Sequence, residues 1–121
     1  MTTNTVTTIW KGNMVFESDN PSGETVFMDA PDEGIENNGL RPKAMMLSSL
    51  AGCSGLDVVS LLKKMRAEVE DFKMVVHGEL TDEHPKYYHK VQVEYHFYGS
   101  ELQKDKIDKA VNLSVEKYCG V

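Results

Sequence analysis

The stretch SSLAGCSGLDVVSLLKK, residues Ser48–Lys64, carries apolar side chains at helical spacing but very little side chain at its centre. That centre, Ala51–Gly55, contains the first cysteine of the chain, Cys53. Each glycine inside a helix costs about 1 kcal/mol relative to alanine. Two explanations account for the glycines equally well: a second backbone segment packs closely against this turn, or a ligand occupies the space beside the sulfur.

The pattern around this stretch predicts a long helix from Pro42 to about Ala67. Proline is favoured at the first helical position, where its missing N–H removes no intrahelical hydrogen bond. Apolar residues recur along one expected core face: Met46, Leu50, Cys53, Leu56 and Val59. Further apolar residues widen that face: Met45, Val58, Leu61, Leu62 and Met65. We therefore expect a central helix that is buried on most sides.

Strand patterns flank the predicted helix. On its N-terminal side, short β-prone runs alternate with Gly-, Asn- and Pro-rich turns, which predicts an antiparallel meander of strands at 5–10, 13–18 and 25–30. On its C-terminal side, apolar and polar residues alternate over 72–80 and 87–99, which predicts a hairpin.

A second helix is predicted to begin at Ser100, because Ser100 and Gln103 fit a capping box. Apolar residues then recur every four positions: Ile107, Val111, Val115 and Cys119. The second cysteine would thus extend the core-facing stripe. The order of strands, helix, strands and helix is typical of an α+β fold.

Length and charge restrict the class of protein. A chain of 121 residues predicts a single domain, and its net charge of −6 argues against nucleic acid or an anionic membrane as the main partner. No uninterrupted apolar run reaches the roughly 18 residues of a membrane span. The N-terminal sequence MTTNTVTTIWKGN lacks the cationic region followed by an apolar region that is typical of an export signal. We expect a cytoplasmic protein.

Cys53 and Cys119 are too few and too far apart in the sequence for a disulfide scaffold or a zinc knuckle. In a reducing compartment they are either two buried small apolar residues or a redox pair. A reactive Cys53 needs a nearby cation, because it lies about three helical turns from the expected helix N-terminus. The candidate cations at turns or at the helix entrance are Lys11, Arg41 and Lys43.

Other polar residues give weaker signals. Asp57 lies one turn beyond Cys53, and together with Gly52 and Gly55 it marks a candidate cleft beside the sulfur. The four histidines, His77, His84, His89 and His96, are spread over the predicted hairpin and its loop without the spacing of a metal site. We expect exposed strand histidines and no metal.

The segments RPKAMMLSSLAGCSGLDVVSLLKK and AVNLSVEKYCGV resemble the OsmC/Ohr family, and in particular its YhfA-like branch. The resemblance covers nearly the whole chain, so residues 1–121 are expected to form one OsmC-like domain. It implies an α+β fold in which antiparallel sheets pack on two long cysteine-bearing helices. It also implies an intertwined homodimer with the functional site at the subunit interface.

The resemblance further implies a thiol-dependent peroxidase that reduces organic hydroperoxides without metal, haem or flavin. Cys53 would be the peroxidatic thiolate, which becomes a sulfenic acid. Cys119 would be the resolving thiol, and a dithiol reductant would restore the pair. The alternatives are a non-catalytic OsmC-like dimer that binds a small apolar or thiol-bearing molecule, and a structural dimer without a ligand.

The chain departs from the family pattern in two ways. Characterised peroxidases of the family carry a glutamate soon after the proline at the helix start, but here the sequence reads Pro42-Lys43-Ala44. The arginine that the family supplies from its N-terminal sheet aligns roughly with Lys11, with Arg41 as a substitute. The family also usually continues beyond the second cysteine, whereas this chain stops two residues after Cys119, which predicts a missing C-terminal segment.

Overall fold

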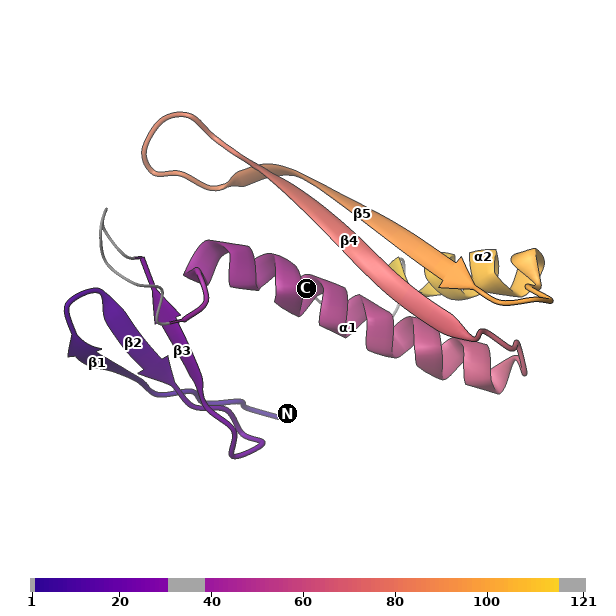
Figure 1. Ribbon diagram of the computed structural model, residues 1–121, viewed down its shortest axis with the longest axis horizontal. Coiled ribbons are helices and arrows are strands. Elements are labelled where there is room, and N and C mark those ends of the chain that lie inside the picture. The colour runs from indigo at the N-terminus through magenta and orange to yellow at the C-terminus, as the bar shows by residue number, and fades with distance from the viewer. Residues whose placement is uncertain (1, 31–38, 116–121) are drawn as a thin grey trace. The chain divides into compact units, whose positions relative to one another are not determined.

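The computed structural model describes residues 2–30 and 39–115 of the chain. Its elements follow the predicted order of strands, helix, strands and helix (Figure 1). The chain divides into two compact units, Met1–Met46 and Leu47–Val121, and the boundary falls early in the first helix. This is the α+β class that the sequence predicts.

The first unit contains an antiparallel meander of three strands, as predicted: β1 (Thr8–Gly12), β2 (Val15–Ser18) and β3 (Val26–Asp29). Gly12 and Asn13 turn the chain between β1 and β2 with positive φ angles of 101° and 48°. Glycine and asparagine tolerate this left-handed region better than other residues.

The sheet of the first unit has no apolar core of its own. Among the described residues, its buried side chains are the polar Ser18 and Asp29. Large apolar side chains of this unit are more than 40% exposed: Ile9, Trp10, Met14, Phe16 and Phe27. The unit therefore presents an unusual amount of apolar surface for a small sheet.

The second unit contains most of α1 (Pro42–Lys64), the hairpin of β4 (Asp71–Leu80) and β5 (Tyr88–Tyr98), and α2 (Lys104–Leu113). The hairpin forms as predicted, with Phe72 opposite Phe97 and Met74 opposite Tyr95. The Phe72 ring stacks on Phe97 with ring centroids 4.5 Å apart.

The core of this unit lies between α1, α2 and the hairpin. Its buried apolar residues come from both helices: Val58, Leu61, Leu62, Ile107 and Ala110. Half-buried residues of the hairpin pack against them, among them Phe72, Tyr95 and Phe97. Burial of each large apolar side chain contributes about 1.5–3 kcal/mol.

The prediction that α1 is buried on most sides is confirmed only in part. Met46 and Leu56, predicted to face the core, are 63% and 75% exposed. The buried residues of the helix are Ser54, Val58, Leu61 and Leu62. α1 is apolar around most of its circumference, so its sequence does not indicate which side meets the hairpin. In the described chain one face is covered, not most sides.

The prediction of the second helix was also wrong in two details. α2 begins at Lys104 with Gln103 as its N-cap and no side-chain cap, while Ser100 donates a hydrogen bond to Glu70 Oε1 at 3.4 Å. The buried positions are Ile107, Ala110 and Ser114, and Val115 is 62% exposed. In a helix of 3.6 residues per turn, residues four apart lie about 40° apart around the axis. The predicted stripe therefore turns away from the buried face along α2. Cys119 lies outside the described residues.

By length and composition alone, α1 would be long and apolar enough to cross a membrane. An 18-residue window within it has a mean hydropathy of 1.6, and 17% of that window is buried. Core helices of folded proteins share this composition, and α1 supplies Val58, Leu61 and Leu62 to the core. The prediction that no membrane is involved is therefore neither confirmed nor contradicted by hydropathy.

The C-terminus of α1 closes with a left-handed residue, Arg66, at φ 57°. The Ala67 N–H bonds the Leu62 carbonyl at 3.0 Å and the Arg66 N–H bonds the Lys63 carbonyl at 3.1 Å. This is the Schellman pattern, in which glycine usually occupies the left-handed position. A residue with a Cβ is strained there.

Replacement of this residue by glycine should stabilise the protein. We expect Arg66→Gly to raise the free energy of unfolding by about 0.5–1 kcal/mol, because relief of the Cβ strain exceeds the entropy that glycine adds to the unfolded chain. Urea unfolding measures the change. Lys64→Gly, inside the last helical turn, is the control and should lower the free energy by about 1 kcal/mol. A loss of stability in both variants would contradict this account of the helix end.

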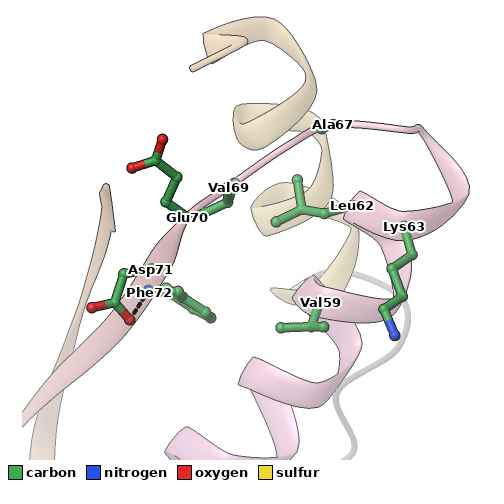
Figure 2. Close-up of a pocket in the computed structure, with 8 residues that line it drawn as sticks. All are labelled: Val59, Leu62, Lys63, Ala67, Val69, Glu70, Asp71 and Phe72. Carbon is green, nitrogen blue, oxygen red and sulfur yellow. Dashed lines mark hydrogen bonds between the residues drawn. The ribbon is translucent and has the colours of Figure 1, made fainter. Parts of the chain in front are cut away.

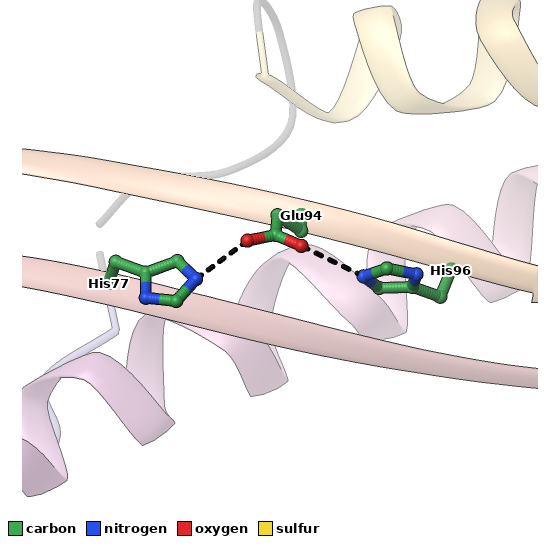
Figure 3. Close-up of polar contacts among 3 residues, drawn as sticks. All are labelled: His77, Glu94 and His96. Atoms are coloured by element: carbon green, nitrogen blue, oxygen red, sulfur yellow. Dashed lines mark hydrogen bonds and ion pairs between the residues drawn. The ribbon is translucent and has the colours of Figure 1, made fainter.

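An exposed polar cluster joins the two strands of the hairpin. Glu94 of β5 accepts hydrogen bonds from His77 of β4 at 2.6 Å and from His96 at 3.0 Å, both through Nε2 (Figure 3). These hydrogen bonds lower the pKa of the Glu94 carboxyl below its ordinary value, and the bond from His77 has the largest effect. Both histidines are partly exposed, as predicted; His77 contacts Glu94 across the two strands, whereas His96 contacts it within β5.

The Glu94 cluster predicts a pH dependence of stability. Because the pKa of Glu94 is lower in the folded state, its stabilising effect is present above the ordinary carboxyl pKa and is lost as the pH falls through the folded value. We expect Glu94→Gln to flatten the acid side of the stability–pH curve, measured by urea unfolding between pH 6 and pH 3.

Two further variants test the origin of this effect. The double variant His77→Gln, His96→Gln should remove the same part of the slope as Glu94→Gln. Glu68→Gln removes one negative charge from an exposed position near the end of α1 and controls for net charge. A Glu94→Gln curve parallel to that of the wild type would contradict the prediction.

Candidate functional site around Cys53

Cys53 lies near the middle of α1, eleven residues after Pro42. Its side chain is half-buried, whereas the next residue, Ser54, is 3% exposed. Consecutive residues of an α-helix are about 100° apart around its axis. The thiol therefore sits at the border between the buried and the exposed face of α1.

The two glycines around Cys53 have different surroundings. A Cβ added to Gly55 would lie 3.1 Å from Met74 Sδ and 3.9 Å from the Phe72 ring, so this glycine allows β4 to approach α1 closely. A Cβ added to Gly52 would meet nothing within 4 Å. Close packing of β4 against α1 thus explains the glycine at position 55. Gly52, by contrast, is surrounded by open space.

Asp57, the third residue of the predicted cleft, lies one turn beyond Cys53 on the same side of α1. Its Oδ2 atom is buried and receives no hydrogen bond from the part of the chain that the structure describes. A buried acceptor without a donor costs about 1–3 kcal/mol. Asp57 is therefore positioned to accept a hydrogen bond from a group outside the described residues.

Sequence reasoning missed a group of buried hydroxyls next to Cys53. Ser54 Oγ lies 2.6 Å from Tyr95 OH of β5 and 3.2 Å from Ser114 Oγ, at the end of α2. Ser114 Oγ also donates to the Ser54 carbonyl at 3.3 Å. The sequence signal was a serine at 54 and a serine at 114, each within an otherwise apolar helical stripe.

The three predicted cations have partners in the first unit or lie at its end. Arg41 forms an ion pair with Asp29 Oδ1, whose side chain is 1% exposed. Lys11 Nζ lies 3.9 Å from Glu17 Oε1 on β2. Lys43 is exposed in the first turn of α1, which contains no acidic residue, as predicted. Cys53 belongs to the second unit, so an interaction between these cations and its thiol stays a prediction.

The pairing of Cys53 with Cys119 also stays a prediction, because Cys119 lies outside the described residues. Within residues 2–30 and 39–115, no group of three or more His, Cys, Asp or Glu side chains is arranged to hold a metal ion. The described site consists of one thiol, a buried carboxylate oxygen and a set of buried hydroxyls.

A cavity of about 320 Å³ opens at the C-terminal end of α1. Figure 2 shows Val59 and Leu62 of the helix opposite Phe72 of β4, with the Glu70 and Asp71 carboxylates turned away from them. The full lining is Val59, Leu62, Lys63, Ala67, Val69, Glu70, Asp71 and Phe72. Cys53 and the two glycines beside it are not part of it.

Known proteins share the sequence and the architecture of this chain. Protein YhfA of Escherichia coli (strain K12) is 32% identical over 115 residues, which cover 93% of this chain and 81% of that protein. The crystal structure of a hypothetical protein from Aquifex aeolicus VF5 has a TM-score of 0.86 and 32% identity over 99% of this chain and 84% of that chain.

A more distant likeness reaches the organic hydroperoxide resistance protein OhrB of Bacillus subtilis. The TM-score is 0.63 at 18% identity, with 98% of this chain and 87% of that chain covered. At this identity the likeness shows the fold. A sequence model of the family described as OsmC-like protein matches residues 35–121. Together with the identity to YhfA, this match shows that the chain belongs to the OsmC/Ohr family of OsmC-like proteins.

Proposed function

We propose that this protein reduces organic hydroperoxides with Cys53 as the peroxidatic residue and Cys119 as the resolving residue. The observation that carries the proposal is the half-buried Cys53 near the middle of the long helix of an OsmC-like fold. Solved structures with this fold include proteins named for organic hydroperoxide resistance.

The proposed chemistry uses the two thiols alone. The Cys53 thiolate attacks the distal oxygen of the hydroperoxide, the O–O bond breaks, and an alcohol leaves after protonation. The resulting sulfenic acid condenses with the Cys119 thiol, which forms a disulfide and releases water. A dithiol reductant then exchanges with the disulfide and restores both thiols. This cycle fits a reducing compartment, so we place the protein in the cytoplasm.

The first step requires a cation near Cys53. Arg41 is held by the buried carboxylate of Asp29, whereas Lys11 forms only a long, exposed pair with Glu17. Exposed pairs of this kind contribute about 0–1 kcal/mol, so Lys11 exchanges its partner at little cost. Lysine supplies charge but lacks the planar fork of arginine. Within the proposal, Lys11 is the more available cation, and Lys43 at the start of α1 is the third candidate.

Two observations favour a second candidate function, a non-catalytic binding protein. The first turn of α1 contains no carboxylate to hold a catalytic cation in place, and Arg41 is committed to Asp29. The ligand would be a small apolar or thiol-bearing molecule beside Gly52, Gly55 and Asp57. The open space at Gly52 and the unpaired Oδ2 of Asp57 would then receive it.

We also propose that the protein is a homodimer. Leu56 and Val59 of α1 are 75% and 41% exposed, and we call this pair the α1 face. The first sheet likewise leaves Trp10 and Phe16 exposed. Apolar surface of this extent is typical of an interface between subunits. A second subunit would also offer a hydrogen-bond donor to Asp57.

Peroxide-driven thiol loss tests the proposed function. Free thiols are counted on denatured protein before and after one stoichiometric exposure to cumene hydroperoxide. We expect the wild type to lose both thiols and Cys53→Ser to lose none. Cys119→Ser should still react once and give a sulfenic acid that dimedone traps, because its peroxidatic thiol is intact.

Two outcomes would contradict this assignment. Equal reactivity of the two single variants would refute the separate roles of the cysteines. Two intact thiols in the wild type would refute the peroxidase proposal and favour the binding protein. In that case, a small molecule retained through purification would be sought by native mass spectrometry.

Sedimentation velocity tests the homodimer. We expect the wild type to sediment with twice the mass of the chain and Leu56→Glu, on the α1 face, to sediment as a monomer at the same concentration. A buried charge without a partner is strongly unfavourable, whereas at an exposed site it costs little. Tyr87→Glu, in the loop between β4 and β5, replaces an exposed residue outside the α1 face and should leave the dimer intact. A monomeric wild type at micromolar concentration would rule out the proposal.

A further inference from the structure

Asp57 is the only acidic residue in α1, and it lies one turn beyond Cys53. Residues four apart in an α-helix lie on the same side, with their Cβ atoms about 6 Å apart. The Asp57 side chain is partly buried, and its Oδ2 atom is shielded from solvent. The half-buried thiol of Cys53 therefore has a carboxylate as a close neighbour on its own helix.

The other charged residues of α1 are much farther from the thiol. Lys43 and Lys63 are each ten residues away from Cys53 along the helix, and Lys64 is eleven. At 1.5 Å per residue, these separations amount to about 15 Å along the helix axis, whereas that of Asp57 is about 6 Å. Salt largely screens charges that are more than about 8 Å apart at physiological ionic strength. Among the charges of α1, that of Asp57 therefore acts most strongly on the thiol.

The charge of Asp57 is not neutralised by the rest of the described chain. The neighbouring elements place neutral side chains against the turn of α1 that carries Cys53: Met74, Tyr95 and Ser114. Within residues 2–30 and 39–115, Asp57 forms no ion pair, and its Oδ2 atom receives no hydrogen bond. Salt screens a partly buried charge less than an exposed one.

We propose that Asp57 is a specificity-determining residue, which makes Cys53 react with neutral and cationic substrates in preference to anionic ones. The inference rests on the proposed function, in which Cys53 attacks an organic hydroperoxide. A hydroperoxide with a carboxylate brings a second negative charge close to Asp57 and is repelled. A hydroxyl or ammonium group on the substrate donates a hydrogen bond to the buried Oδ2 atom instead. The substrate class is thus an organic hydroperoxide that carries a hydrogen-bond donor and no acidic group.

Charged thiol reagents test this selectivity without a hydroperoxide. Three methanethiosulfonates of similar size carry a trimethylammonium, a hydroxyl or a sulfonate group. With each reagent, the Cys53 thiolate displaces methanesulfinate and forms a mixed disulfide. The rates are measured on the Cys119→Ser variant, in which Cys53 is the one remaining cysteine. Each rate is divided by that of the same reagent with 2-mercaptoethanol, a neutral thiol, which removes the intrinsic reactivity of the reagent.

We expect the normalised rates to fall in the order cation, neutral, anion, with the cation about tenfold or more faster than the anion. Asp57→Asn keeps the shape of the side chain without its charge and should bring the three rates to within about twofold of one another. Asp57→Glu keeps the charge and should keep the order. Together with the parent, this variant leaves the test decisive if Asp57→Asn fails to fold, which circular dichroism reports.

Two control variants separate the charge at position 57 from net charge and from stability. Glu68→Gln removes an exposed negative charge fifteen residues from Cys53 and should leave the order of the rates unchanged. Ile107→Val weakens the packing of the core without a change in charge, so it should alter all three rates by the same factor.

A matched pair of hydroperoxides extends the test to the proposed reaction. The hydroperoxides of linoleic acid and of its methyl ester differ by one negative charge. We expect the wild type to have a kcat/KM about tenfold higher for the ester, and Asp57→Asn to remove this difference.

The outcomes distinguish the inference from the proposed function. Equal normalised rates for the three methanethiosulfonates on the parent would overturn the inference, and so would an Asp57→Asn variant that keeps the parent's order. A protein that selects among these reagents by charge but reduces neither hydroperoxide would refute the proposed function alone. Charge selectivity would then stand as a property of the Cys53 thiol.

Discussion

The hydrogen bonds of Ser54 fix the rotation of α1 about its own axis, and the site depends on that rotation. α1 is apolar on most of its surface, so burial of apolar side chains alone permits several orientations of nearly equal energy. A buried serine permits only the one in which Tyr95 and Ser114 reach its hydroxyl. This orientation places Cys53 at the border of the core, where the thiol is shielded on one side and accessible on the other.

Much of the fold could be predicted from the sequence because it depends on local patterns. Turn residues and two-residue alternation gave the meander and the hairpin, and Pro42 marked the start of α1. The buried face of α1 could not be predicted, since its choice depends on partners distant in the sequence. The predicted cap at Ser100 failed for the same reason: Glu70, thirty residues away, competes for its hydroxyl.

The candidate site could be predicted only in part. Cys53 was identified from its setting, and Gly55 from the cost of a glycine inside a helix, although the close neighbour is a strand. The contacts among the hydroxyls of Ser54, Tyr95 and Ser114 were not predicted, because a serine in an apolar stripe is indistinguishable from a surface serine until its partners are known. The ion pair between Arg41 and Asp29 could not be predicted from the sequence either, since it links residues on either side of a loop.

The composition of the sheet in the first unit affects how its stability depends on protein concentration. Three short strands whose described residues include no buried apolar side chain gain too little free energy to order themselves in isolation. Order in this sheet therefore requires contact with further apolar surface, and the exposed Trp10 and Phe16 side chains are available for such a contact. If that surface belongs to another copy of the chain, amide protons of β1–β3 exchange with solvent faster on dilution, whereas those of β4 and β5 exchange at a rate independent of concentration. The amide exchange rates of β1–β3 would then report the state of assembly, and those of β4 and β5 would report the integrity of the core.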